Sequence, residues 1–318
     1  MSTTAPIPVS ILTGFLGAGK TTLVNHILRE RHGYRFAVIV NEVGEIGIDG
    51  DLITRQEEEI VQLSNGCLCC TVRKDLVRGV QQLLQKGGFD YLLVETTGIA
   101  DPGPVAQTFL NIPALTKLVR LDAIITVVDA EQVARHLRDS EVTREQIAMA
   151  DFLLLNKIDL VESSKVDEAE RALRELNPHA TVLRTDHSRA SLNQILDMQA
   201  FDVDRKLALN PELLNELKAR AHGDIASFGF SFDRPFVPER LEAAIQGLSE
   251  SARIFRSKGF LWFEGNPRRA VFHGVNNRFQ IFWDRLWEKG EERSSKLVFI
   301  GRDLDRDTIH DALKACLA

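Results

Sequence analysis

The sequence of 318 residues lacks the features that mark membrane, secreted and nucleic-acid-binding proteins. No apolar run approaches the roughly 20 residues that a membrane-spanning helix needs. The first six residues have neither the basic nor the apolar region of a signal peptide. The formal net charge is −6 and no basic stripe stands out. These absences predict a cytosolic protein with no membrane and no nucleic acid among its partners.

Cysteine is also scarce, and its distribution is informative. Of four cysteines, Cys67, Cys69 and Cys70 lie within four residues, and Cys316 stands apart. In a cytosolic protein such a cluster is more typical of metal binding or catalysis than of disulfides. Cys316 falls at helical spacing with Leu313, and we expect it to pack in the core.

The length suggests two domains. Short apolar runs alternate with helical patterns from residue 7 to about residue 196. The predicted strands are 9–12, 36–40, 91–95, 123–128, 152–155 and 181–183, and the predicted helices are 22–31, 72–86, 102–110, 131–150 and 164–177, the last with Ser164 as its start signal. This alternation predicts an α/β fold with a mostly parallel sheet and helices on both of its faces.

The pattern changes after a polar segment. Residues 197–223 are predicted to form a linker between a first domain, 1–196, and a second domain, 224–318. In the second domain the predicted strands are 225–232, 260–263, 270–274, 278–283 and 297–300, with helices at 238–248 and 305–317. Clustered strands with few helices predict a smaller α+β domain with a largely antiparallel sheet. Trp262, Trp283 and Trp287 are expected in its core or at an interface.

The strongest motif is Gly-Phe-Leu-Gly-Ala-Gly-Lys-Thr at residues 14–21, which fits the phosphate-binding loop G-x-x-x-x-G-K-[ST]. It sits where a predicted strand turns into a predicted helix. Glycines let the backbone approach phosphate oxygens, and the helix start offers unpaired N–H groups. A glycine-rich turn with an exposed lysine is the alternative, and the flanking strand and helix disfavour it. The predicted nucleotide contacts here are Gly14, Gly17, Ala18, Gly19, Lys20, Thr21 and Thr22.

A second motif follows the strand at 91–95. Glu95 ends the strand and Gly98 comes three residues later, as in the second phosphate-side motif of P-loop proteins. We expect Thr21 and Glu95 to hold Mg²⁺, and the Gly98 N–H to contact the γ-phosphate. Lys20 and Glu95 are the predicted catalytic residues. Asp49, in a segment placed like a switch loop, is a further candidate Mg²⁺ ligand or a turn residue.

The third motif, Asn156-Lys157-Ile158-Asp159, fits N-K-x-D, which reads guanine in GTPases. A carboxylate can accept the two adjacent N–H groups that guanine offers and adenine lacks. A solvated charged loop is the alternative reading, and the order of the motifs favours GTP. Residues 184–187, one strand later, are a guess for a backbone N–H that meets the base carbonyl.

The cysteine cluster is the metal signal. Thiolates favour Zn²⁺ or Cu⁺, and the three ligands Cys67, Cys69 and Cys70 leave a tetrahedral ion one ligand short. Glu42, Glu45 or a water is a candidate for the fourth position. Two alternatives stay open: three small buried side chains, and a C-x-x-C redox motif formed by Cys67 and Cys70.

Together these motifs closely resemble the CobW-like GTPases of the SIMIBI class, a family that includes zinc chaperones. The resemblance extends to Ile-Ala-Asp-Pro at 99–102 and Gly-Phe-Leu-Trp at 259–262, and it covers nearly the whole chain. It implies a P-loop GTPase domain, a CobW-type C-terminal domain, and zinc held by the cysteine loop and handed to a client metalloprotein. The chain departs from the family pattern in two ways. Its eight histidines form no histidine-rich tract, and Val40 occupies a position where some relatives carry an acid.

The expected reaction is attack of water on the γ-phosphate of GTP. Ile99 occupies the position where many GTPases carry a water-orienting glutamine, so we expect a slow basal rate. Two other hypotheses are a non-enzymatic metal buffer that binds GTP as a structural ligand, and a redox protein. The choice among zinc, cobalt and nickel, and whether the chain forms a homo-oligomer, stay open at this point.

Overall fold

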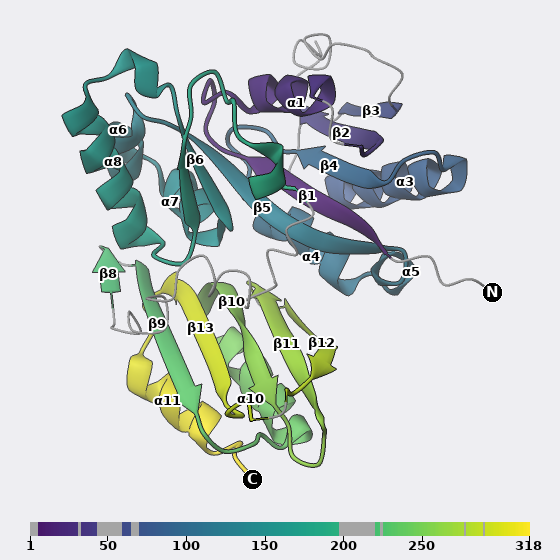
Figure 1. Cartoon of the computed structure of the whole chain (residues 1–318), viewed down its shortest axis with the longest axis vertical. Coiled ribbons are helices and arrows are strands. Elements are labelled where there is room, and N and C mark those ends of the chain that lie inside the picture. The colour runs from purple at the N-terminus through teal and green to yellow at the C-terminus, as the bar shows by residue number, and fades with distance from the viewer. Residues whose placement is uncertain are drawn as a thin grey trace. The chain divides into compact units, whose positions relative to one another are not determined.

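The computed structural model describes residues 6–30, 33–42, 59–64, 70–196, 220–222, 225–276, 278–288 and 290–318. The chain divides into two compact units, Met1–Arg174 with Ala180–Gln199, and Glu175–His179 with Ala200–Ala318 (Figure 1). The predicted linker, 197–223, lies almost wholly outside the described residues, so its boundaries stay a prediction. None of the described helices has the length and apolar character needed to cross a membrane.

The first unit is built on a seven-stranded sheet in which every pairing is parallel. Its strands stand in the order β3-β2-β4-β1-β5-β6-β7. Their bounds are β1 Ile7–Thr13, β2 Phe36–Glu42, β3 Glu59–Ser64, β4 Tyr91–Glu95, β5 Val119–Asp129, β6 Phe152–Asn156 and β7 Thr181–Arg184. All five residues of β4 and of β6 are buried, which agrees with the four apolar residues that begin each strand.

Helices connect these strands. They are α1 Lys20–Arg29, α3 Cys70–Lys86, α4 Gly103–Asn111, α5 Pro113–Thr116, α6 Val133–Asp139, α7 Glu141–Met149 and α8 Ser163–Leu176, with 3₁₀ turns η1 Ile158–Leu160 and η2 Leu192–Gln194. In Figure 1, α1 lies above the strands and α4 lies below them. The predicted α/β P-loop architecture is confirmed.

Several predicted elements were wrong in detail. The helix predicted at 131–150 is two helices, because the Ser140 side chain accepts a hydrogen bond from the Thr143 N–H and starts α7 there. Ser164 does not start α8, which begins one residue earlier. Strand β3 was not predicted at all. Its sequence mixes polar and apolar residues, and its place depends on pairing with β2, a contact that is distant in sequence.

The second unit contains a six-stranded sheet with antiparallel pairings in the order β12-β11-β10-β13-β9-β8. The bounds are β8 Arg220–His222, β9 Ile225–Phe232, β10 Arg253–Trp262, β11 Arg268–Val275, β12 Arg278–Leu286 and β13 Ser295–Arg302. The helices are α10 Pro238–Ser251 and α11 Arg306–Lys314. The predicted small α+β domain is confirmed, but β10 is far longer than the predicted 260–263. Its first half contains Arg256, which is 1% exposed, and burial of an arginine is not visible in the sequence.

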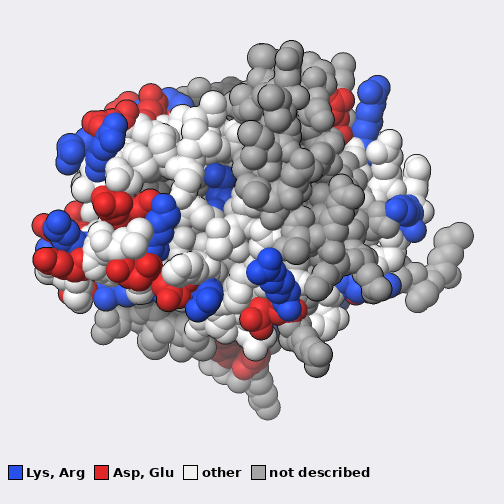
Figure 2. Space-filling model, turned by 90° about the horizontal axis from the view of Figure 1, so that it is seen from above, with Lys and Arg blue, Asp and Glu red and all other residues white. Residues whose placement is uncertain are grey.

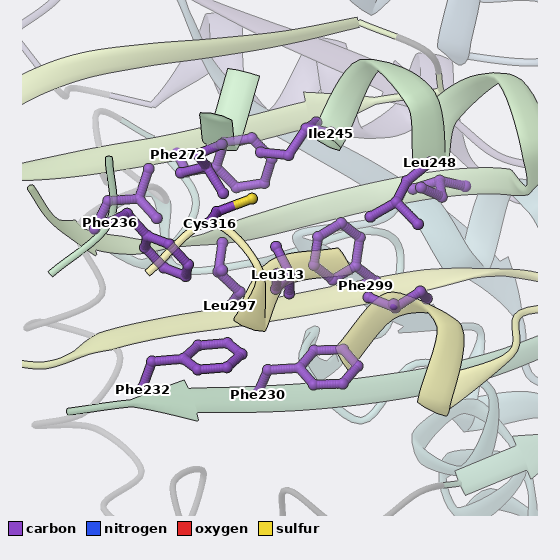
Figure 3. Close-up of a cluster of buried hydrophobic side chains, with 14 of the residues drawn as sticks. Phe230, Phe232, Phe236, Ile245, Leu248, Phe272, Leu297, Phe299, Leu313 and Cys316 are labelled. Carbon is purple, nitrogen blue, oxygen red and sulfur yellow. The ribbon is translucent and has the colours of Figure 1, made fainter. Parts of the chain in front are cut away.

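The core of the second unit lies between this sheet and its two helices (Figure 3). Aromatic side chains from the strands, among them Phe230 and Phe299, meet Ile245 of α10 and Leu313 of α11. Cys316 is buried in this cluster, as its spacing predicted, and burial raises the pKa of its thiol. The three tryptophans are not core residues of this cluster, and Trp283 is 45% exposed.

Charged side chains of both signs intermingle on the surface. Figure 2 shows this most clearly on the side where α6 and α8 lie in Figure 1. There Arg184 forms ion pairs of 2.7 Å with both Asp167 and Glu170 of α8. Burial by itself would raise the pKa of Glu170, but hydrogen bonds from Arg184 and Arg174 hold it below its usual value.

Candidate nucleotide-binding site

The loop between β1 and α1 has positive φ angles at its three glycines. Gly14, Gly17 and Gly19 have φ values of 134°, 74° and 113°. A Cβ at residue 14 would contact the carbonyl oxygen of Val127, and one at residue 19 would lie 2.7 Å from the Ser188 hydroxyl. Both positions therefore require glycine, because the φ angle is positive and because a side chain would have no room. Gly19 is also the N-cap of α1, so the helix starts at the loop and offers its first N–H groups there.

Lys20, the first residue of α1, is held by this loop. Its side chain is largely buried, and its ammonium donates to the carbonyl oxygens of Gly14 at 2.9 Å and Phe15 at 3.2 Å. A cation is thus fixed over the loop, beside the positive end of a helix. Thr22 is exposed on the first turn of the same helix.

Thr21 and Glu95 are brought together from positions 74 residues apart. The Thr21 hydroxyl donates a hydrogen bond of 3.1 Å to the Glu95 carboxylate, and Glu95 is 4% exposed. The pairing of β1 with β4, in which Leu12 faces Glu95, sets this contact. A hydroxyl and a carboxylate are oxygen donors of the kind that Mg²⁺ takes in nucleotide sites, so the pair fits that ion.

Gly98 lies against the phosphate loop. A Cβ at residue 98 would come within 2.5 Å of the Leu16 backbone N, so the close approach requires glycine. The turn after Gly98 is held by Gln146 of α7, whose side-chain amide donates to the Ala100 carbonyl at 2.9 Å. Gln146 was missed in the sequence, because it lies in no motif and acts across 46 residues. Ile99, in the same turn, is 48% exposed.

Asn156 connects the phosphate loop to the loop after β7. Its side-chain amide donates to the Ala18 carbonyl and to the Ser188 hydroxyl, both at 2.9 Å. Its side-chain oxygen accepts from the Ser188 N–H at 2.8 Å and from the Thr185 hydroxyl at 3.1 Å. The Ser188 hydroxyl in turn donates to the Gly19 carbonyl at 2.9 Å. The first residue of the N-K-x-D motif is therefore a structural link, and Ser188 is a member of it that the sequence did not suggest.

The other two residues of that motif face outward. Lys157 has a φ of 62°, and its ammonium lies 2.7 Å from the Asp129 carboxylate at the end of β5. Asp159 is exposed on η1. Asp129 was missed in the sequence, although an acid directly after the predicted strand at 123–128 was the available signal. The guess for residues 184–187 is untested: the Arg184 side chain pairs with α8, as described above.

An aromatic contact joins the phosphate loop to α6. The ring of Phe15 lies 4.1 Å, centroid to centroid, from the ring of His136 on α6. Burial lowers the pKa of His136, and the nearby Arg135 acts in the same direction, whereas Asp129 and Asp139 oppose it.

The predicted zinc ligands lie at the limits of the described structure. Cys67, Cys69, Glu45 and the candidate Mg²⁺ ligand Asp49 lie outside the described residues, and Glu42 and Cys70 are described in the backbone alone. Glu42 ends β2 and Cys70 begins α3. Within the part of the chain that the structure describes, no three His, Cys, Asp or Glu side chains are grouped closely enough to hold a metal.

Comparisons with known proteins identify relatives of both units. Residues 8–184 match the model of the CobW/HypB/UreG nucleotide-binding domain, and residues 225–317 match that of the cobalamin synthesis protein CobW C-terminal domain. The chain is 36% identical to "Zinc chaperone YjiA" of Escherichia coli, with 96% of this chain and 98% of that protein covered. It is 44% identical to "Zinc-regulated GTPase metalloprotein activator 1" of Schizosaccharomyces pombe, with 96% of this chain and 84% of that protein covered. The crystal structure of Zn(II)-bound YjiA GTPase superposes with a TM-score of 0.71 at 29% identity, over 99% of this chain and 100% of that one.

Proposed function

The chain belongs to the CobW/HypB/UreG family, and from that premise we propose that it is a GTP-hydrolysing metallochaperone that binds zinc on Cys67, Cys69 and Cys70 and transfers it to a client metalloprotein. The observation that carries the nucleotide part is the hydrogen bond between Thr21 and Glu95 beside Lys20. It joins the two phosphate-side motifs at the carboxyl edge of a parallel sheet, where nucleotides bind in such folds.

Each residue then has a role at the nucleotide. Lys20 and the loop amides neutralise charge on the β- and γ-phosphates, and Gly98 offers its N–H to the γ-phosphate. Thr21 and Glu95 hold Mg²⁺, which when bound neutralises phosphate charge. Asp159 accepts the two N–H groups of guanine. The contact between Lys157 and Asp129 holds the lysine stem beside the base.

Hydrolysis is slow in this proposal. The turn that follows Glu95 presents Ile99, an apolar side chain, where a group that orients the attacking water is expected. Gln146 holds that turn, but its side-chain amide donates to the backbone of the turn, so we do not assign it the role of orienting water. A partner or a second copy of the chain would have to supply the missing group for rapid turnover.

The cargo part rests on the sequence of the cysteine loop and on the relatives, which are called zinc chaperones and a zinc-regulated GTPase metalloprotein activator. The segment with the cysteines lies between β3 and α3; β3 is paired with β2, and β2 is paired with β4, which carries Glu95. A change at the γ-phosphate therefore has a route through two strand pairings to the start of the cysteine loop. Glu42 or Glu45 completes the zinc shell until the client's ligand replaces it.

The test is a zinc titration against a competing chelator, with the protein bound first to a non-hydrolysable GTP analogue and then to GDP. Linkage requires zinc affinity to differ between the two states, by roughly 5- to 150-fold for a typical coupling. Glu95→Ala should remove the difference. Cys67→Ser should remove zinc binding, whereas the matched variant Cys316→Ser should leave it unchanged, because Cys316 lies in the core of the second unit.

Two outcomes would favour the other hypotheses. Equal zinc affinities in both nucleotide states, without phosphate release over many turnovers, describe a metal buffer with GTP as a structural ligand. A dithiol–disulfide couple on Cys67 and Cys70 that is indifferent to nucleotide describes a redox protein. Phosphate release that Lys20→Ala abolishes excludes the buffer.

A further inference from the structure

One buried polar side chain of the first unit belongs to none of the motifs and yet contacts one of them. Gln146 lies on α7 and is fully buried. Its side-chain nitrogen donates to the Ala100 carbonyl at 2.9 Å and, less closely, to the Gly98 carbonyl at 3.4 Å. These two carbonyls flank Ile99, whose side chain is exposed, in the turn that follows Glu95. One buried amide therefore holds two points of that turn.

The oxygen of the same amide has no comparable contact. Within the described part of the chain, Oε1 of Gln146 is buried and accepts no hydrogen bond. Turning the amide over would place this oxygen against two carbonyl oxygens, so the two contacts of the nitrogen determine its orientation. A buried acceptor without a donor lowers stability, and proteins accept such a cost mainly at functional sites. The contacts of the nitrogen with the turn are therefore the feature that calls for a glutamine here.

The backbone of Gln146 is anchored to the strand beside the phosphate loop. Its main-chain carbonyl accepts a hydrogen bond of 2.9 Å from the Thr126 hydroxyl of β5, and both residues are buried. Thr126 pairs with Thr13, which directly precedes the loop. Gly14 begins the loop and packs closely against Val127, the next residue of β5. The same two residues of β5 thus locate Gln146 and the start of the phosphate loop.

The strand side of the turn is held separately. The Thr96 N–H donates to the Leu12 carbonyl at 2.9 Å, directly after the last pair of β1 with β4. Two residues later, Gly98 lies so close to the phosphate loop that a side chain has no room. Gln146 ties this later part of the turn to α7. Loss of the amide should therefore release Gly98 while the strand keeps Glu95 in place.

We propose that Gln146 is a positioning residue that makes the site distinguish GTP from GDP, which rests on the proposed function of the chain. Gln146 keeps Gly98 where its N–H meets the γ-phosphate. GDP has no γ-phosphate, so its binding does not depend on the position of Gly98. When the turn spends only a fraction of the time in the competent position, the affinity for GTP falls by that fraction and the affinity for GDP does not.

The experiment measures the affinities of the full-length chain for GDP and for a non-hydrolysable GTP analogue, both with Mg²⁺. Gln146→Met keeps the length of the side chain and removes both donated bonds. It should weaken binding of the analogue roughly tenfold, as expected for one or two hydrogen bonds, and change the affinity for GDP by less than about twofold. Thr143→Val is the matched control and should change neither affinity. Thr143 is also buried on α7, and its hydroxyl makes no hydrogen bond to the described residues.

A second variant leaves the Gln146 side chain in place. Thr126→Val removes the hydroxyl that holds the Gln146 backbone, and it should weaken binding of the analogue selectively by about two- to fivefold. Selective weakening of the analogue in either variant supports the proposal. If in both variants the affinity for GDP falls at least as much as that for the analogue, or neither affinity changes, the proposal is overturned and the proposed function stands. A wild type that binds neither nucleotide would overturn both.

Discussion

The two ends of the candidate nucleotide site are built differently. At the phosphate end Lys20 and Glu95 are buried, and each is held by a protein group: Lys20 by loop carbonyls and Glu95 by Thr21. At the base end Asp159 is exposed and the Lys157 side chain is 32% exposed. The phosphate end therefore exists before nucleotide binds. At the base end the Asp159 carboxylate is in contact with solvent, and it gains a partner only when a base binds.

This difference separates affinity from specificity. A preorganised cradle of backbone amides and one cation contributes to binding of any nucleoside triphosphate, since every one carries the same phosphates. In the proposed function the choice of base falls to Asp159, whose contact with guanine would replace its contact with water. Asn156 belongs to both ends, because its amide reaches Ala18 in the phosphate loop and its oxygen reaches Ser188.

The largest expected effect comes from breaking the link. Asn156→Ala removes four hydrogen bonds and leaves buried partners such as the Ser188 N–H unsatisfied, at about 1–3 kcal/mol for each such group. We expect the free energy of unfolding to fall by about 3 kcal/mol and the affinities for GTP and GDP to fall together. Denaturant unfolding and nucleotide titration measure both. The control, Asn266→Ala, removes one exposed turn bond and should cost less than about 1 kcal/mol. Equal costs would show that Asn156 is not a link.

A smaller effect, confined to the base end, is expected from Asp159→Asn. Loss of a charge-assisted contact should weaken GTP binding by about 1.5–3 kcal/mol and improve binding of xanthosine triphosphate, whose base presents a different set of donors and acceptors. Because Asp159 is exposed, the unfolding midpoint should not change. Glu162→Gln, three residues later and also exposed, is the matched control. A wild type that binds ATP as tightly as GTP would contradict the guanine assignment.

The motif residues of the candidate site could be predicted from the sequence, but the groups that hold them in place could not. The phosphate loop, Glu95 and Gly98 follow from local patterns, because each motif directly follows a strand and parallel strands end at one edge. The groups that hold those motifs in place did not follow. Ser188, Asp129 and Gln146 act through contacts with residues 32, 28 and 46 positions away, and no local spacing encodes such a contact. The same holds for β3 and for the buried Arg256, whose places depend on tertiary pairing.

The smallest expected effect concerns the aromatic contact between the phosphate loop and α6. Burial lowers the pKa of His136, whose ring lies against Phe15, so the folded protein binds this proton less readily than the unfolded chain does. The stability that results is fully present above the ordinary histidine pKa of about 6.5 and is lost as the pH falls through the folded-state pKa. His136→Gln should therefore flatten the loss of stability between about pH 7 and pH 5, in a comparison of thermal midpoints at matched ionic strength. The comparison variant is His310→Gln, which replaces a histidine on α11 of the second unit. If the two variants have the same pH profile, the Phe15–His136 contact does not contribute to the pH dependence of the phosphate end.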